Sequence, residues 1–382
     1  VCALDHAPEV ERHCHFAVMS AFVGHVPAPV RLADVVRRVL KDVAADPAFK
    51  QGKGRRWYGL SLSQVEEFTL YTMLVLLGAK DAYMATMAFT PSPRSSGGAA
   101  AGLRTLVTAI QRSAAPFVES TDLVCVCVQG PTANEEEGGD YLLLRRAVFL
   151  HKLAALSSAG VADGTVTAED AFARAHPLVV DVNGSQPSTC SLAEGRLRQL
   201  LAASFAADTG TAGKAPLELE LIHASNAPEL HAEAGLCLCA GWLLGYPCLY
   251  RHLAGGEEQE VANSLCMQLL RKCSVVVPAA VVLNLDLCML PHLTSVEGFL
   301  QQEPAVAGAP EISMLRRARE DPTAAVNVLD FTVPVALLEA AGPYLLESFQ
   351  RALEQQLEQA RAVLGAACCV AYADFTEPNV VM

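Results

Sequence analysis

Polar side chains that could bind a ligand are spread over the second half of the chain. Asp181 ends a short apolar run just before Asn183-Gly184, and open α/β sheets hold ligands at such strand ends. A cap or turn hydrogen bond is the alternative role for this carboxylate. Asn226 precedes an apolar helix, where it either caps the helix or helps to hold an anion. Asn263 opens a strand, and a turn is the simplest role for it.

Arg271 is the fourth candidate, because its neighbours on one face of a predicted strand are apolar. Alternate positions 265, 267, 269, 273 and 275 are Leu, Met, Leu, Cys and Val, so the pattern predicts a guanidinium carried toward the interior. A buried charge without a partner is very unfavourable, so a carboxylate or an anionic ligand must accompany it. We expect a salt bridge to Asp181 or Asp330, with anion binding as the alternative. An enzyme would need all four candidates to converge on one concave pocket.

Motifs for established chemistries do not occur in the sequence. There is no phosphate-binding loop, dinucleotide-binding glycine turn, nucleophile elbow or zinc-protease helix, so we predict no cofactor and assign no catalytic residue. Cys125 and Cys127 share one face of a strand, and His13-Cys14-His15 is the densest group of possible metal ligands. Without a second pair of ligands at a suitable spacing, we predict no metal site.

The composition is that of a packed protein. The chain has 382 residues, of which 52% are hydrophobic and 18% are charged, which excludes disorder over most of its length. A net charge of −13 argues against a nucleic-acid partner. The thirteen cysteines lie mostly in apolar runs and no secretory leader is visible, so we expect reduced thiols and a cytoplasmic or nuclear location. The uncharged run 234–250 contains glycine and proline and is shorter than the roughly 20 residues of a membrane span, so none is predicted.

Strand-like and helix-like segments alternate along the chain. About ten strands and six or more helices predict an α/β or α+β fold with one large mixed sheet flanked by helices. We expect residues 1–56 to form an N-terminal helical extension and residues 57–382 a single α/β domain with inserted loops. The predicted helices are 32–45, 64–77, 101–113, 146–158, 192–206, 229–244 and 343–364, and the predicted strands are 82–89, 123–128, 141–144, 178–182, 217–222, 247–251, 265–277, 280–289, 326–333 and 367–373.

Several short segments together resemble a known family. They are the run Thr69-Leu-Tyr-Thr-Met-Leu-Val-Leu-Leu-Gly-Ala-Lys-Asp-Ala-Tyr83, Asp122-Leu-Val-Cys-Val-Cys-Val128 with Asp140-Tyr-Leu-Leu-Leu144, Leu178-Val-Val-Asp-Val182, Leu243-Leu-Gly-Tyr-Pro247, Asn263-Ser-Leu-Cys-Met267 and Asp330-Phe-Thr-Val-Pro334. Their order is similar to that of an uncharacterised eukaryotic family named from chromosome-one open reading frame seventy-four. The resemblance covers about residues 57–360 and implies a single domain. It implies no mechanism, because the family has no established activity.

The sequence therefore predicts a soluble α/β protein that binds a protein or a small ligand without catalysis. One alternative is a divergent enzyme with an anion-binding pocket at strand ends. A second alternative is a subunit of a larger assembly, which the low charge and the apolar helix 229–244 suggest. A large exposed apolar patch would favour that alternative.

Overall fold

The structure of the protein is a computed structural model. The described residues are 30–46, 60–85, 98–118, 122–128, 140–156, 176, 178–182, 186–189, 196, 199–202, 205, 220–223, 235–251, 265, 268–289, 313–321, 323–340 and 343–376. Asn226, Asn263, the His13-Cys14-His15 group and most of the predicted helix 192–206 lie outside them.

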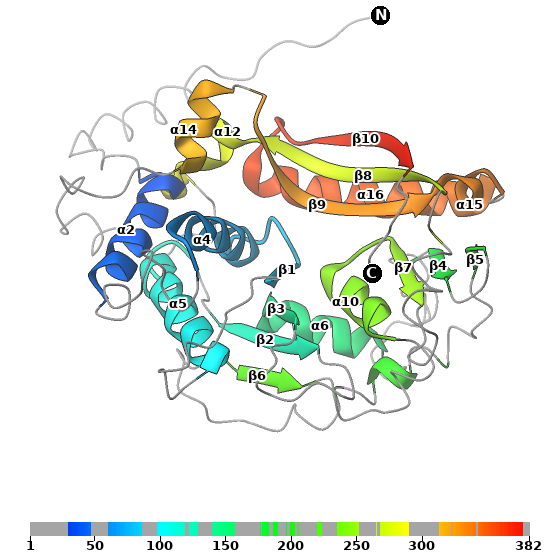
Figure 1. Ribbon diagram of the computed structural model, residues 1–382, viewed down its shortest axis with the longest axis horizontal. Helices are drawn as coiled ribbons and strands as arrows, with labels where there is room; N and C mark the ends of the chain where they lie inside the picture. The colour runs from blue at the N-terminus through cyan, green and yellow to red at the C-terminus, as the bar shows by residue number, and fades with distance from the viewer. Residues whose placement is uncertain are drawn as a thin grey trace, which may run out of the picture.

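The described strands form three small sheets (Figure 1). A four-stranded sheet has the order β1 (Ala82–Ala85), β3 (Asp140–Arg145), β2 (Leu123–Val128) and β6 (Glu220–His223). A three-stranded sheet contains β5 (Ser188–Thr189), β4 (Leu178–Asp181) and β7 (Cys248–Arg251), and the C-terminal sheet contains β10 (Cys369–Thr376), β8 (Leu269–Pro278) and β9 (Ala325–Pro334).

The prediction of one large mixed sheet is therefore wrong, although the mixed α/β class is correct. Alternating polarity marks a segment as a strand, but it does not say which other segment pairs with it. In the C-terminal sheet, β8 pairs antiparallel with both β9 and β10. These three strands thus complete a sheet of their own, and helix α16 (Pro343–Leu364) packs against it.

The four-stranded sheet separates two hydrophobic cores. Cys125 and Leu143 point into the first core, whereas their neighbours Val124 and Leu142 point into the second, as the period of two in a strand requires. The first core also takes buried side chains from α2 (Leu32–Ala45), α4 (Leu62–Leu76) and α5 (Gly98–Ala114). The second core lies against α6 (Arg146–Leu156) and α10 (Leu236–Leu244).

Local sequence signals explain several element boundaries. Helices α2 and α16 have the predicted ranges. Helix α4 begins at Leu62, before the predicted start, because Ser61 and Gln64 form a capping box. Gly78, just after the end of α4, has a φ of 84°, a conformation that glycine adopts without steric cost.

The segment 280–289 was predicted as a strand, and this prediction is wrong. Residues Ala279–Leu283 form helix α12, and Leu287–Met289 form a 3₁₀ turn, η3. Pro278 ends β8 and stands at the helix N-cap, so the chain changes conformation where the apolar run continues. A short apolar run suits a strand and a buried helix equally well, so periodicity does not distinguish them.

Two shorter helices complete the C-terminal half. Helix α14 (Ser313–Glu320) packs on α12 and α4, and α15 (Val335–Ala340) follows β9 directly. No helix in the described ranges combines the length and the apolar composition needed to cross a bilayer.

Candidate functional site

Arg271 has a carboxylate partner, but it is neither of the two that the sequence suggested. Its Nε and Nη2 atoms each donate a hydrogen bond of 2.8 Å to Asp374, which stands opposite it on β10. The two side chains are 38% and 40% exposed, so the prediction of a guanidinium carried to the interior is wrong. The apolar residues at alternate positions of the strand assigned Arg271 to the correct face of β8, which is the face toward α16. Arg271, however, lies near the start of the strand, where that face is open.

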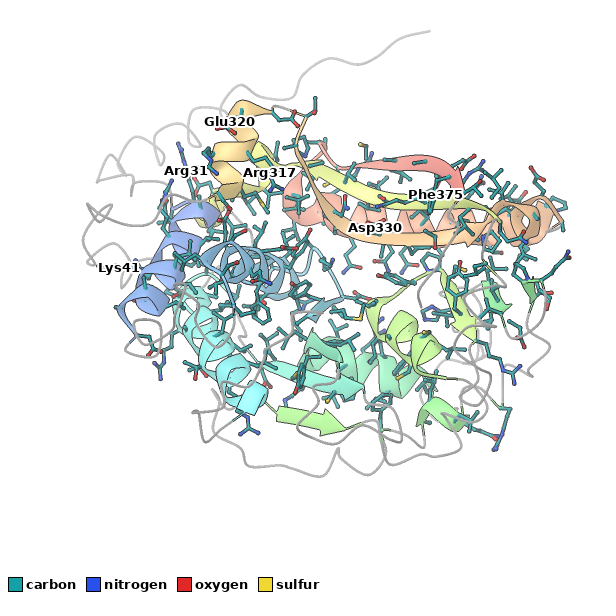
Figure 2. The ribbon with its side chains drawn as sticks, viewed as in Figure 1. Arg31, Lys41, Arg317, Glu320, Asp330 and Phe375 are labelled. Carbon is teal, nitrogen blue, oxygen red and sulfur yellow. The ribbon has the colours of Figure 1, made fainter. Side chains whose placement is uncertain are left out.

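The predicted partners of Arg271 are engaged elsewhere. Asp181 on β4 makes a half-buried salt bridge of 2.5 Å with Arg251, its neighbour on β7. Asp330 on β9 accepts a hydrogen bond from Ser274 and lies 2.8 Å from Lys272, and Figure 2 labels it on the lower edge of the C-terminal sheet. Asp181 and Arg271 therefore belong to different sheets and to different ion pairs.

Arg271 and Asp374 line a pocket of about 410 Å³ between the C-terminal sheet and helices α15 and α16. This volume lies within the range of roughly 300–1,000 Å³ that is usual for small-molecule sites. The remaining lining residues are Leu338 on α15, Leu346, Phe349 and Gln350 on α16, and Tyr372 on β10. The pocket thus has an apolar floor and a polar wall, and we call it the Arg271 pocket.

The charges of the Arg271 pocket nearly cancel. The hydrogen bonds from Arg271 lower the pKa of Asp374, and those to Asp374 raise the pKa of Arg271. Both groups therefore stay ionised and form a pair with no net charge. Nη1 of Arg271 makes no hydrogen bond with a described residue, while Glu339 adds a negative charge nearby. Arg271 and Asp374 therefore offer hydrogen-bond donors and acceptors to a ligand, but the pair has little excess positive charge to attract an anion.

Exposed apolar side chains accompany this pocket. Leu150, Leu269 and Tyr372 are the large apolar residues that stand out as exposed among the described residues, at 46%, 48% and 57%. Leu269 lies two positions from Arg271 on β8, and therefore on the same face of the sheet. Tyr372 lines the pocket itself. Leu269 and Tyr372 therefore lie on the same face of the sheet as the pocket.

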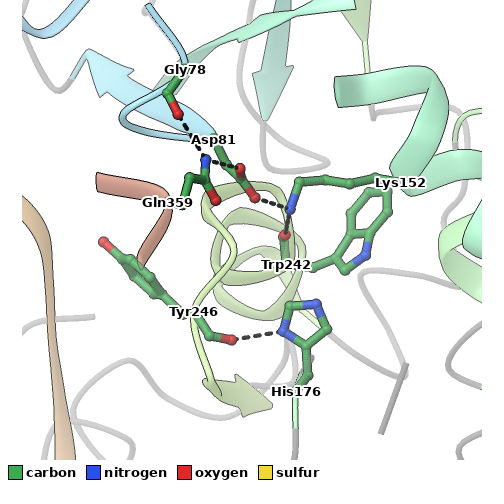
Figure 3. Close-up of polar contacts among 7 residues, drawn as sticks. All are labelled: Gly78, Asp81, Lys152, His176, Trp242, Tyr246 and Gln359. Atoms are coloured by element: carbon green, nitrogen blue, oxygen red, sulfur yellow. Dashed lines mark hydrogen bonds and ion pairs between the residues drawn. The ribbon is translucent and has the colours of Figure 1, made fainter. Parts of the chain in front are cut away.

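A second group of polar residues lies in the interior, where β1, α6, α10 and α16 meet (Figure 3). Lys152 of α6 lies 2.9 Å from Asp81 and also donates to the carbonyl oxygen of Trp242. Gln359 of α16 donates to Asp81 and to the carbonyl of Gly78. Burial would raise the pKa of Asp81, but Lys152 and Gln359 outweigh it and lower that pKa. We call this group the buried polar junction.

His176 extends the buried polar junction to the β4 sheet. Its Nδ1 lies 2.7 Å from the carbonyl oxygen of Tyr246. Because a carbonyl only accepts, Nδ1 carries the proton and donates it. Burial, followed by the charge of Lys152, lowers the pKa of His176 to about 4, so the ring is neutral at physiological pH.

Gly245 allows the end of α10 to approach this junction. Its φ is 75°, and a Cβ atom at this position would lie 2.9 Å from Asp81. The N–H of Gly245 donates to Trp242 and that of Tyr246 donates to Gly241, which is the Schellman pattern of helix ends. Gly245 therefore lets the chain turn at the end of α10 and place the carbonyl of Tyr246 next to His176.

The residues of the buried polar junction connect β1, α6, α10 and α16. Their lowered pKa values keep Asp81 ionised and His176 neutral, as a structural role requires. Burial also raises the pKa of the Cys125 and Cys248 thiols, and that of Cys273 to about 11, so these thiols are poor nucleophiles at neutral pH. In the described part of the chain, no three His, Cys, Asp or Glu side chains group as metal ligands would.

Sequence reasoning missed Asp374 and the residues of the junction. The predicted last strand ends at residue 373, one position before Asp374, so the pattern places no carboxylate opposite Arg271. A weak signal for Asp81 existed, because it follows the Gly78 helix end within the first family-like segment. No comparable signal marks His176 or Gln359, which reach the junction through contacts that are remote in the sequence.

Comparison with known proteins adds no assignment. No protein-family model matches the chain, and no significant match is found among curated proteins or solved structures.

Proposed function

We propose that this protein binds a small, mainly apolar molecule with one uncharged hydrogen-bonding end, without transforming it. The observation that carries the proposal is the Arg271 pocket, where Leu338, Leu346 and Phe349 face a neutral ion pair. An apolar body would replace water against these side chains, and its polar end would reach Gln350, Tyr372 or Nη1 of Arg271.

The ion pair also argues for binding rather than catalysis. A general acid or base needs a pKa near the working pH, whereas the hydrogen bonds from Arg271 lower the pKa of Asp374, and burial raises that of Tyr372. The same pairing disfavours the anion-binding alternative, because Asp374 already neutralises the guanidinium. We further propose a cytoplasmic or nuclear location and a relation to the family named above, both of which rest on the sequence alone.

The test is a titration of the full chain with benzamide, a neutral aromatic amide, followed by saturation-transfer NMR. A ligand of nine heavy atoms at roughly −0.4 kcal/mol per atom should bind with a Kd of about 1–3 mM. Gln350→Trp should abolish binding, because an indole at this lining position fills the pocket. Gln355→Trp is the matched control, since Gln355 is an exposed residue of the same helix that does not line the pocket.

Loss of the signal in Gln350→Trp alone would support the proposal. Two results would overturn it: equal binding by both variants, or no binding by the unmodified chain at about ten times the expected Kd.

A further inference from the structure

Strand β10 forms an edge of the C-terminal sheet, and no other strand of the described residues covers it. It pairs with β8 in an eight-residue register without irregularity, and no described strand pairs with its other side. Six of its eight residues are exposed. Figure 1 shows it at the rim of the molecule, with β8 on one side and no described element on the other.

Within the described residues, this edge has little of the usual protection against pairing with another chain. Proteins normally protect edge strands with proline, lysine, a bulge or an inward-pointing charge. β10 contains neither proline nor lysine, and the register shift of this sheet lies between β8 and β9. Its one charged residue, Asp374, is held on the sheet face by Arg271.

We propose that β10 pairs antiparallel with β10 of a second copy of this chain, which joins the two C-terminal sheets across a two-fold axis. Two-fold symmetry between identical antiparallel strands requires each residue to face one on the same side of the sheet. With Ala373 on the axis, Tyr372 faces Asp374 of the second copy, and Ala371 faces Phe375 of the second copy. Figure 2 labels Phe375 toward the end of β10.

This register suits the composition of β10. The residue on the axis meets its own copy, and Ala373 is small and uncharged. Asp374 meets a phenol instead of a second carboxylate, and the large Phe375 meets the small Ala371. This register keeps the two Asp374 carboxylates from facing each other, and like charges placed directly opposite each other destabilise a sheet.

The overall charge opposes association at long range. Each copy carries a net charge of −13, so two copies repel each other until salt screens them. The dimer should therefore strengthen when the salt concentration rises, which is the opposite of what attraction between unlike charges would give.

Sedimentation equilibrium of the full chain tests the stoichiometry. Between about 1 and 200 µM, we expect a monomer–dimer equilibrium that shifts toward dimer at higher salt. Ala373→Glu places two carboxylates on the axis and should weaken the dimer about tenfold or more. Leu150→Glu, on the exposed side of α6, is the control and should not weaken it.

Disulfide formation tests the register. In a Cys369→Ser background, Ala373→Cys places two thiols directly opposite each other, about 5 Å apart at Cα, within the range for a disulfide. Ala371→Cys places them about 14 Å apart along the strands. Mild oxidation should link the first variant and not the second, with the unsubstituted background as the baseline.

A monomer at the highest concentration would overturn the proposal and leave β10 open to a strand of another protein. A dimer that Ala373→Glu leaves intact, or that Ala373→Cys does not link, would overturn it as well. The result is separable from the Arg271 pocket, because Gln350→Trp fills the pocket and leaves β10 unchanged.

Discussion

His176 makes the stability of the protein sensitive to acid. Its ring is buried, and its pKa is lowered to about 4 by burial and by Lys152, compared with about 6.5 in an unfolded chain. The unfolded chain therefore binds a proton that the folded chain does not bind between these two values. Above pH 6.5 this residue costs no stability, and as the pH falls toward 4 the folded state loses about 3 kcal/mol.

We predict that His176→Asn removes much of this acid sensitivity, since the asparagine amide can still donate to Tyr246. The measurement is the free energy of urea unfolding at pH 7 and at pH 4.5. His151→Asn, at an exposed position of α6, is the matched control. Asp81 does not mask the effect, because its pKa is lowered and its contribution is lost only below the ordinary carboxylate range. An equal loss of stability in His176→Asn and the unmodified chain would contradict the prediction.

At the scale of elements, a buried carboxylate attaches helix α14 to helix α4. Glu66 is 3% exposed and accepts hydrogen bonds of 2.8 and 2.6 Å from the N–H groups of Ser313 and Met314. These N–H groups belong to the first turn of α14, which has no intrahelical acceptors for them. The negative charge of Glu66 also suits the positive end of the helix dipole.

We predict that Glu66→Ala lowers the free energy of unfolding by about 2 kcal/mol, the usual contribution of hydrogen bonds to a charged group. In this variant, the exchange of backbone amide hydrogens should accelerate more in α14 than in the other helices. Glu67→Ala is the control, because Glu67 is the exposed neighbour of Glu66 on the same helix. If the two variants lose the same stability, the attachment of α14 does not depend on this carboxylate.

At the scale of the whole molecule, the division into a helical extension at 1–56 and a domain at 57–382 stays a prediction. Helix α2 lies within the proposed extension, yet its buried residues belong to the same core as those of α4, α5 and the C-terminal sheet. If this core is cooperative, damage to α2 should reach the second core, where Trp242 is 2% exposed.

Val39→Asp places a carboxylate at a fully buried position of α2, and we predict that it destabilises the whole protein by about 3 kcal/mol or more. In a Trp57→Phe background Trp242 is the remaining tryptophan, and its fluorescence reports unfolding of the second core. Its transition should shift to lower urea concentration. Lys41→Asp, on the outward side of α2 (Figure 2), is the control. An unchanged Trp242 transition would show that α2 unfolds independently.

Local patterns in the chain were sufficient for several helices and most of the described strands, but not for α12, α14 and α15. Leu32–Ala45 and Pro343–Leu364 have the predicted bounds, as does Leu123–Val128, because helix and strand periodicity depend on neighbours a few residues away. The glycine at position 78 and the alternation of Cys125 and Cys127 are signals of the same kind.

Local patterns did not predict contacts between residues that are remote in the sequence. Arg271 meets Asp374, which is 103 positions away, and His176 meets Tyr246, which is 70 positions away. An apolar strand face predicts that a charge needs a partner, but several carboxylates satisfy that need equally well. The choice among them, and the division of the ten described strands into three sheets, arise from the packing of the whole chain, which no local pattern reports.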